Sequence, residues 1–293
     1  MSAIILRRRS LGRGSANGIE AASTTGIKAV RNWVSQDWTG HGGLCDPLLV
    51  FRWGCTSTIP GEGMQSPIVV VNTAESIHWC SDKRRGRMDM QAASVLVPWS
   101  VGVDADGSLS LAPAHTLGSA MYIGRPSRHA QGRNLVCGGF RDVCRQVAEW
   151  GGGYMSVQIA KVAEYRVFVC QGRVVWVAQK TPGNPDDVAW NVAQGGRFDN
   201  VRWTEWPMAV VKEALAAANV SDTDFSGVDV MVDAEGRAYV LEVNSAPSQT
   251  SPYRQQCVAK AFDYIVTNGI QHFPTVEMRR TWKDVIHPAL RQE

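Results

Sequence analysis

The chain has 293 residues, of which 44% are hydrophobic and 19% are charged, so we expect it to bury a substantial core rather than to be disordered. Its 30 basic and 27 acidic residues leave a net charge of +3, which is too balanced for a protein that coats nucleic acid. The seven cysteines form no CxxC motif, which favours neither a zinc site nor a disulfide-stapled fold. No apolar run approaches the length of a membrane span. We therefore expect a cytoplasmic protein with no nucleic-acid or membrane partner.

The first part of the chain is predicted to be an N-terminal α/β domain, residues 1–81. Its apolar runs are continuous, which is typical of buried parallel strands. Strands are predicted at residues 4–7, 48–52 and 68–72, and a helix at residues 26–35. The pattern changes to a polar and basic helical stretch at residues 83–93, and we place the domain boundary just before it.

The rest of the chain is predicted to form two α+β subdomains, a central one at residues 82–155 and a C-terminal one at residues 156–293. Three of the later strands, 154–158, 165–170 and 174–179, are expected to be neighbours in one antiparallel sheet. The remaining predicted elements are strands at 121–123 and 135–137, helices at 140–150, 207–218 and 252–268, and a hairpin of strands 228–232 and 238–243.

The hairpin carries the clearest chemical signal. Antiparallel pairing brings Asp229 near Glu242, and the two-residue step from Glu242 to Asn244 puts both side chains on one face of the sheet. Three oxygen-bearing side chains of this kind suit a hard cation such as Mg²⁺, which takes its other ligands from water and nucleotide phosphates. Taken alone, the hairpin is explained equally well as an edge hairpin with solvated acids.

Residues 240–247, with the sequence Val-Leu-Glu-Val-Asn-Ser-Ala-Pro, resemble the metal-binding strand of ATP-grasp ligases. That family includes D-alanine ligases, glutathione synthetases and enzymes that add glutamate to a ribosomal protein. The resemblance extends over most of residues 68–268, and the chain also looks like the compact ATP-grasp proteins of tailed bacteriophages. It implies an ATP-grasp fold, in which two α+β subdomains sandwich ATP. It further implies that Asp229, Glu242 and Asn244 hold one or two Mg²⁺ ions, or Mn²⁺, against the phosphates.

The same resemblance assigns catalytic roles to Arg166, Lys180 and Asn191. Residues 164–175 resemble a family strand pair whose arginine faces the transferring phosphoryl group, so Arg166 would neutralise its charge, with Lys180 as a second cation. Outside this family, Glu164 and Arg166 would be a surface pair of small energetic value. Residues 189–196 are similar to an Asn-x-x-x-Gly-Gly segment that donates hydrogen bonds to an acyl phosphate. An ordinary glycine loop is the alternative.

Nucleotide contacts are implied at three further places. Residues 158–161 match the hinge whose backbone receives adenine. Residues 125–134 stand where the family has a lysine-ended strand and a glycine loop over the phosphates, although arginine replaces that lysine and the loop has a single glycine. For the lysine that opens the basic helix, a solvated helix face is nearly as good an interpretation. The residues assigned to the nucleotide are Lys83, Arg125, His129, Gly132, Gln158, Lys161 and Glu164.

These motifs together predict an ATP- and Mg²⁺-dependent ligase that joins a carboxylate to an amine through an acyl phosphate. The substrates would be small molecules, peptides or proteins. A kinase that phosphorylates a hydroxyl group and an inactive ATP-binding scaffold are the alternatives. A homodimer is one option for the assembly, because dimers are common among relatives.

Overall fold

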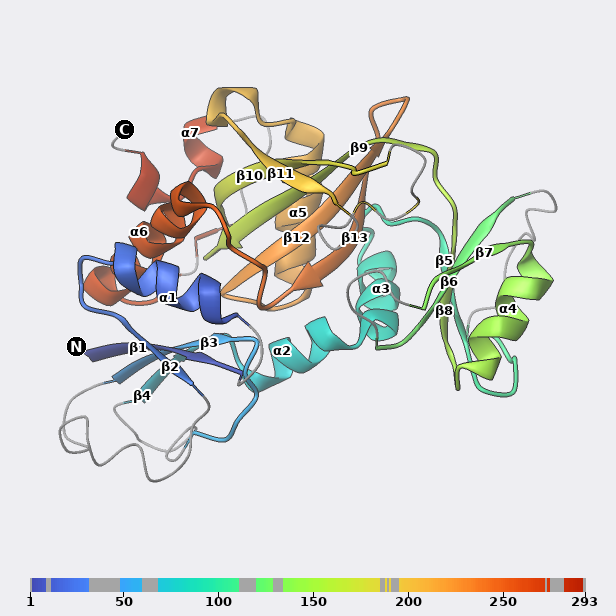
Figure 1. The fold of residues 1–293 in the computed structure, drawn as a ribbon, viewed down its shortest axis with the longest axis horizontal. Helices are drawn as coiled ribbons and strands as arrows, with labels where there is room; N and C mark the ends of the chain where they lie inside the picture. Colours follow the sequence, from blue (N-terminus) through green and yellow to red (C-terminus); the bar gives the residue numbers. More distant parts are fainter. Residues whose placement is uncertain are drawn as a thin grey trace.

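The computed structural model describes residues 2–8, 12–31, 48–59, 68–110, 120–128, 134–184, 188, 190, 195–271, 273–274 and 282–291. The strands of this part of the chain form three sheets, each drawn from a different stretch of the sequence (Figure 1). Within the same residues, no helix is both long enough and apolar enough to cross a membrane.

The first sheet is parallel, with the strand order β2-β1-β3-β4. Its strands are β1 (Ser2–Arg7), β2 (Lys28–Arg31), β3 (Leu48–Trp53) and β4 (Ile68–Val71). Every residue of β3 is buried, as expected for a central parallel strand. The three strands predicted in this region are confirmed.

The helix predicted at residues 26–35 is wrong. Residues 28–31 form β2, and the helix of this region is α1 (Arg13–Ala22). β2 is short and pairs with β1 along its whole length, and the Glu20 carboxylate of α1 accepts a hydrogen bond of 3.0 Å from Ala29 N. These contacts are nonlocal and therefore leave no trace in the local pattern.

The second sheet is antiparallel, with the order β5-β8-β6-β7, and α4 (Phe140–Glu149) covers one of its faces at the far end of the molecule (Figure 1). Its strands are β5 (Ser100–Val103), β6 (Tyr122–Pro126), β7 (Val136–Gly138) and β8 (Gly153–Val157). The prediction that residues 154–158 pair with the two strands that follow them is wrong, because β8 lies between β5 and β6. The chain leaves this sheet after residue 157 and enters another one.

The third sheet is antiparallel, with the order β11-β10-β9-β12-β13. It contains β9 (Lys161–Cys170), β10 (Arg173–Thr181), β11 (Arg197–Val201), β12 (Phe225–Asp233) and β13 (Ala238–Asn244), and a short 3-10 turn, η3 (Trp203–Glu205), follows β11. The predicted pairing of β9 with β10 and the predicted hairpin of β12 and β13 are confirmed. β11 was not predicted.

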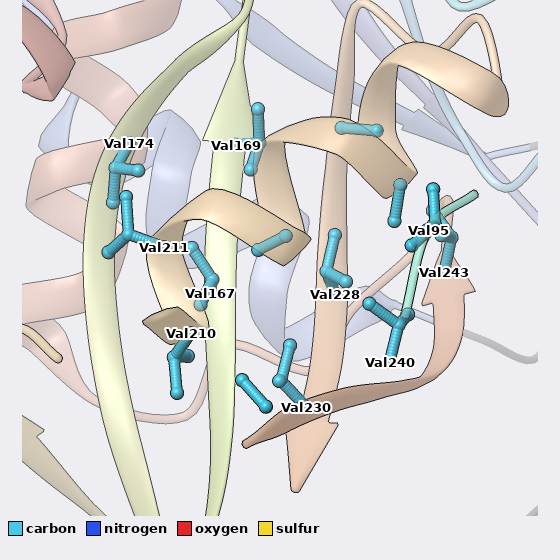
Figure 2. Packing of buried hydrophobic residues seen from close by; sticks show 14 of the residues in the cluster. Val95, Val167, Val169, Val174, Val210, Val211, Val228, Val230, Val240 and Val243 are labelled. Atoms are coloured by element: carbon cyan, nitrogen blue, oxygen red, sulfur yellow. The ribbon is translucent and has the colours of Figure 1, made fainter. Parts of the chain in front are cut away.

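Each face of the third sheet is covered by one helix. On one side α5 (Met208–Val220) packs its valines, Val210 and Val211, against valines of β9 and β12 such as Val167 and Val228 (Figure 2). On the other side α6 (Pro252–Asn268) packs against aromatic residues, with Phe168, Phe225 and Trp53 in one cluster. Because Trp53 belongs to β3, this second core joins the first sheet to the third. The helices predicted in these positions are confirmed.

Two consecutive helices, α2 (Ala74–Ser81) and α3 (Lys83–Ala92), connect the first sheet to the second. The side chain of Asp82 caps α3 by accepting a hydrogen bond of 3.0 Å from Arg85 N. Within α3 the buried Arg87 donates to the backbone oxygens of Val240 (2.9 Å) and Leu241 (2.6 Å). These bonds hold the predicted basic helix against β13, so that its first residue, Lys83, lies beside the end of that strand.

The C-terminal segment, α7 (Trp282–Val285) and η4 (Pro288–Leu290), docks on β10 through a buried histidine. The backbone N of His287 donates to Val174 O at 2.9 Å, and its ring lies edge-on to Tyr264. Ala289 N donates to Nδ1 at 3.3 Å, so Nε2 carries the proton and donates to Gln171 Oε1. Burial, together with the charges of Arg291 and Arg173, lowers the pKa of His287 to about 3.

The free energy of unfolding is expected to fall as the pH drops from about 6.5 towards 3, by about 1.4 kcal/mol per pH unit at most. The sign follows because the unfolded state binds a proton at His287 in this range, whereas the folded state does not. Urea unfolding at several pH values measures the slope. In His287→Asn the amide oxygen can replace the Nδ1 acceptor, so the slope should be smaller; an unchanged slope would contradict this assignment.

Candidate functional site

The predicted site residues come together where β9, β10, β12 and β13 lie side by side. In the register, Asp229 of β12 is opposite Arg166 of β9 on one side and Glu242 of β13 on the other. Lys180 of β10 is opposite Glu164 of β9. Residues that are far apart in the sequence therefore occupy adjacent positions across one sheet.

Buried ion pairs link five of these side chains. Arg166 donates from Nε and Nη2 to the two oxygens of Asp229, at 2.6 and 2.7 Å. Lys180 Nζ donates to Asp229 Oδ2 at 3.2 Å and also to Glu164 Oε1. The second oxygen of Glu164 accepts from Lys161 Nζ at 2.6 Å. Both carboxylates are thus fully engaged by cations, and the group carries a surplus of positive charge.

The neighbouring charges determine the protonation states in this group. Burial acts to raise the pKa of Asp229, but Arg166 and Lys180 outweigh it and lower that pKa. Burial acts to lower the pKa of Lys180, but Asp229 and Glu164 outweigh it and raise that pKa. At Lys161 the balance is reversed: burial outweighs Glu164, and the pKa is lowered. Asp229 is therefore ionised and Lys180 protonated at neutral pH.

The ring of Phe198 on β11 packs against three cations, and sequence reasoning missed it. Arg166, Lys180 and Arg254 lie 4.9, 5.7 and 5.5 Å from the ring centroid. Arg254 comes from the first turn of α6, is buried, and donates to Asn200 Oδ1 at 3.0 Å. Contacts between a cation and an aromatic face of this kind are favourable. A lone arginine that follows a proline at a helix start is the signal that marks Arg254 in the sequence.

A cluster of oxygen atoms surrounds the ammonium group of Lys83 at the end of β13. Lys83 Nζ lies 3.0 Å from Val243 O, 3.2 Å from Asn244 Oδ1 and 3.4 Å from Glu242 Oε2. Asn244 Nδ2 donates to the other oxygen of Glu242 at 3.0 Å. The oxygens of Glu242 and Asn244 therefore already surround a positive charge.

The donor set at this cluster fits a hard divalent cation. Carboxylate and amide oxygens are ligands that Mg²⁺ accepts, and the ion takes its remaining ligands from water or phosphates. The Glu242 side chain is 29% exposed and open to such a ligand, whereas both oxygens of Asp229 are engaged by Arg166 and Lys180. Among the residues that the structure describes, no group of three or more His, Cys, Asp or Glu side chains forms a self-sufficient metal site.

The residues assigned to the nucleotide line the approach from the second sheet. Arg125 lies on β6, and its charge contributes to lowering the pKa values of Lys161 and Arg87. Lys83 N donates to Ser127 O at 2.8 Å, so the end of β6 meets the start of α3. Arg125 and Lys83 thus lie on the same side of the buried ion pairs.

The predicted hinge connects β8 to β9, and therefore the second sheet to the third. Gln158 N donates to Met121 O at 2.8 Å, and Lys161 Nζ lies 4.4 Å from the ring centroid of Trp190. Three predicted site residues, His129, Gly132 and Asn191, lie outside the described residues.

The comparisons agree with this geometry. Residues 112–263, more than half of the chain, match an ATP-grasp domain family, the third family of its clade. Among curated proteins no sequence matches. The fold is similar to D-alanine–D-alanine ligase from Bacillus anthracis, with a TM-score of 0.65 and 14% identity over 92% of this chain and 97% of that one.

Two further solved structures share the fold. The macrocyclase MdnC from Microcystis aeruginosa, bound to its precursor peptide MdnA, has a TM-score of 0.60 and 13% identity over 92% of this chain and 100% of that one. The D-cycloserine synthetase DcsG has a TM-score of 0.61 and 16% identity over 89% and 99%. The predicted ATP-grasp fold is confirmed. The chain belongs to this ATP-grasp domain family.

Proposed function

We propose that the protein uses ATP and Mg²⁺ to activate a carboxylate as an acyl phosphate and to join it to an amine. The observation that carries the proposal is the oxygen cluster of Glu242 and Asn244 beside the cation-rich group of Arg166, Lys180 and Lys161. Oxygen donors for a metal thus adjoin cations that suit phosphate. The family match supports ATP as the phosphate source.

We propose that Glu242 and Asn244 hold Mg²⁺, or Mn²⁺, with Asp229 as the third candidate. The metal, when bound, would offset the charge of the ATP phosphates. Lys83 occupies the oxygen cluster in the structure, so its ammonium group would turn towards the phosphates when the metal binds. Because a lysine side chain has a long flexible stem, this movement needs no change in the backbone.

Each cation has a role in the proposal. Arg125 and Lys83 would bind the phosphates that remain with ADP, while Arg166 and Lys180 would face the transferring phosphoryl group. Residues 158–161 would receive adenine, Glu164 the ribose, and His129 and Gly132 would close over the phosphates. Asn191 and the amides of residues 195–196 would hold the acyl oxygens.

The proposed reaction has two displacement steps. An oxygen of the substrate carboxylate attacks the γ-phosphorus, the bond to the β-phosphate oxygen breaks, and ADP leaves. The amine nitrogen then attacks the acyl carbon, and inorganic phosphate leaves with the carboxylate oxygen. The chain contributes by positioning the reactants and by offsetting charge in a site shielded from water.

We also propose three units, residues 1–81, 82–155 and 156–293, each centred on one sheet, with ATP between the second and third. The amine and carboxylate are proposed to be small molecules or peptides. The titles of similar structures support both, since they include two enzymes named for small products and a macrocyclase bound to a precursor peptide.

Product analysis tests the reaction. Purified protein is incubated with ATP, Mg²⁺ and paired panels of carboxylates and amines, and ADP, phosphate and new amides are measured. We expect ADP and inorganic phosphate to form in equal amounts, with an amide, when both substrates are present. Formation of a phosphoester from a hydroxyl compound, with no release of phosphate, would instead establish a kinase.

A further inference from the structure

Three arginines gather at the carboxyl edge of the first sheet, away from the residues assigned above. Arg7 ends β1 and Arg31 ends β2, and the two are partners in the parallel register. Arg13 begins α1, the next helix along the chain. Burial and the positive charges of Arg13 and Arg31 together lower the pKa of Arg7. The three guanidinium groups are therefore close enough to repel one another.

No carboxylate in the described part of the chain neutralises these arginines. Arg7 is only 7% exposed, its Nη1 donates to Arg8 O at 3.3 Å, and its Nε has no partner. Arg13 and Arg31 are exposed. A buried guanidinium without a counter-charge is costly, so an anion that binds there would relieve the repulsion and supply the missing acceptors.

The first turn of α1 faces the same edge. Gly12, the residue before the helix, has φ 75° and no side-chain cap, so the helix start presents backbone N–H groups that favour an anion. Two buried polar side chains without partners adjoin this turn. Trp53 Nε1 would lie 3.0 Å from a Cβ at Gly12. Gln249 is 1% exposed, neither of its side-chain polar atoms is bonded, and its backbone N donates to Ser15 Oγ at 2.8 Å.

The loop after β13 connects this edge to the oxygen cluster. Gly54 follows Trp53, and a Cβ at Gly54 would lie 2.7 Å from Cβ of Ala246. Ala246 is two residues beyond Asn244. A molecule held at the arginines would therefore approach the oxygen cluster along residues 245–249. In open parallel sheets, ligands commonly bind outside the carboxyl ends of the strands.

We propose that Arg7, Arg13 and Arg31, with the first turn of α1, bind an anionic group of the substrate, a carboxylate or phosphate remote from the reacting atoms. The assignment of this ligand as substrate rests on the proposed function, whereas the anion site itself does not. Arginine suits the task because its planar fork binds both anions through paired hydrogen bonds.

Titration calorimetry without ATP or Mg²⁺ tests the anion site. The probes are tetraglutamate and inorganic phosphate, which separate the two sources of negative charge. Wild type is expected to bind one of them, and the double variant Arg13→Gln/Arg31→Gln should bind it about tenfold more weakly or worse. The matched control Arg141→Gln/Arg145→Gln removes two exposed arginines from α4 and should bind like wild type. Binding of neither probe, or equal binding by both double variants, would overturn the proposal.

Two further measurements separate this proposal from other failures. Arg7→Met removes the buried charge, so it should weaken binding and raise the melting temperature; a lower melting temperature with unchanged binding would make Arg7 structural and overturn its role. Stabilisation by ATP and Mg²⁺ should be the same in the Arg13→Gln/Arg31→Gln variant as in wild type. If wild type itself shows no such stabilisation, the proposed function fails, while anion binding still decides the arginine site.

Discussion

Replacing Asp229 by alanine is expected to lower the free energy of unfolding by about 3–5 kcal/mol, because the change leaves two buried cations without their counter-charge. Arg166 loses both of its hydrogen bonds to the carboxylate, and Lys180 loses one of its two. Chemical denaturation of both proteins at pH 7 measures the difference.

The matched control for this change is Asp199→Ala on β11. Asp199 also forms an ion pair within the third sheet, with Arg197 at 3.1 Å, but its side chain is 52% exposed. The loss there should be about 1 kcal/mol or less. Equal losses in the two variants would mean that the Asp229 group is no more important to stability than a surface pair.

The Asp229 contribution should persist at mildly acidic pH. The folded state lowers the pKa of Asp229, so its contribution is present above the unfolded value of about 3.9 and disappears only as the pH falls through the lower folded value. Acid sensitivity between about pH 6.5 and 4 is therefore assigned to His287 and not to this carboxylate.

Replacing Glu242 by alanine is expected to reduce turnover by about 100-fold or more, since the loss of one preorganised charged contact at the phosphates costs several kcal/mol of transition-state stabilisation. Lys83 keeps its hydrogen bonds to Val243 O and Asn244 Oδ1, so the fold should be retained. Steady-state ADP release measures turnover once substrates are known.

The control Glu235→Ala removes the same charge from the turn of the same hairpin. Glu235 is exposed and pairs with Arg237 of that turn, at a distance from the oxygen cluster along the strand. Its activity should match wild type. Full activity in Glu242→Ala would reject the assignment of that residue to the metal.

Local sequence patterns were sufficient for much of the fold. The continuous apolar runs of β3 and β4 predict buried parallel strands because parallel strands are covered on both faces. The turn at Asp233 and the alternation on either side of it predict the hairpin, and with it the position of Asp229 opposite Glu242. Helix α6 was predicted with the bounds that it has in the structure.

The errors lie where contacts between distant segments decide the structure. β2 is a strand because it pairs with β1, and β8 belongs to the second sheet because β5 and β6 flank it. The site has the same limit. Arg166 reaches Asp229 only because β9 lies between β10 and β12, an order that no local pattern reveals. The role of Phe198 depends on β11, which has little apolar sequence.

Nucleotide-dependent melting tests the central claim, a Mg²⁺- and ATP-binding site at Glu242 and Asn244, most directly. A ligand that binds only the folded state raises the melting temperature. We expect a clear rise in wild type with ATP and Mg²⁺ together, a smaller one with either alone, and loss of the combined effect in Glu242→Ala. No rise in wild type at saturating nucleotide, or an equal rise in Glu242→Ala, would contradict the account.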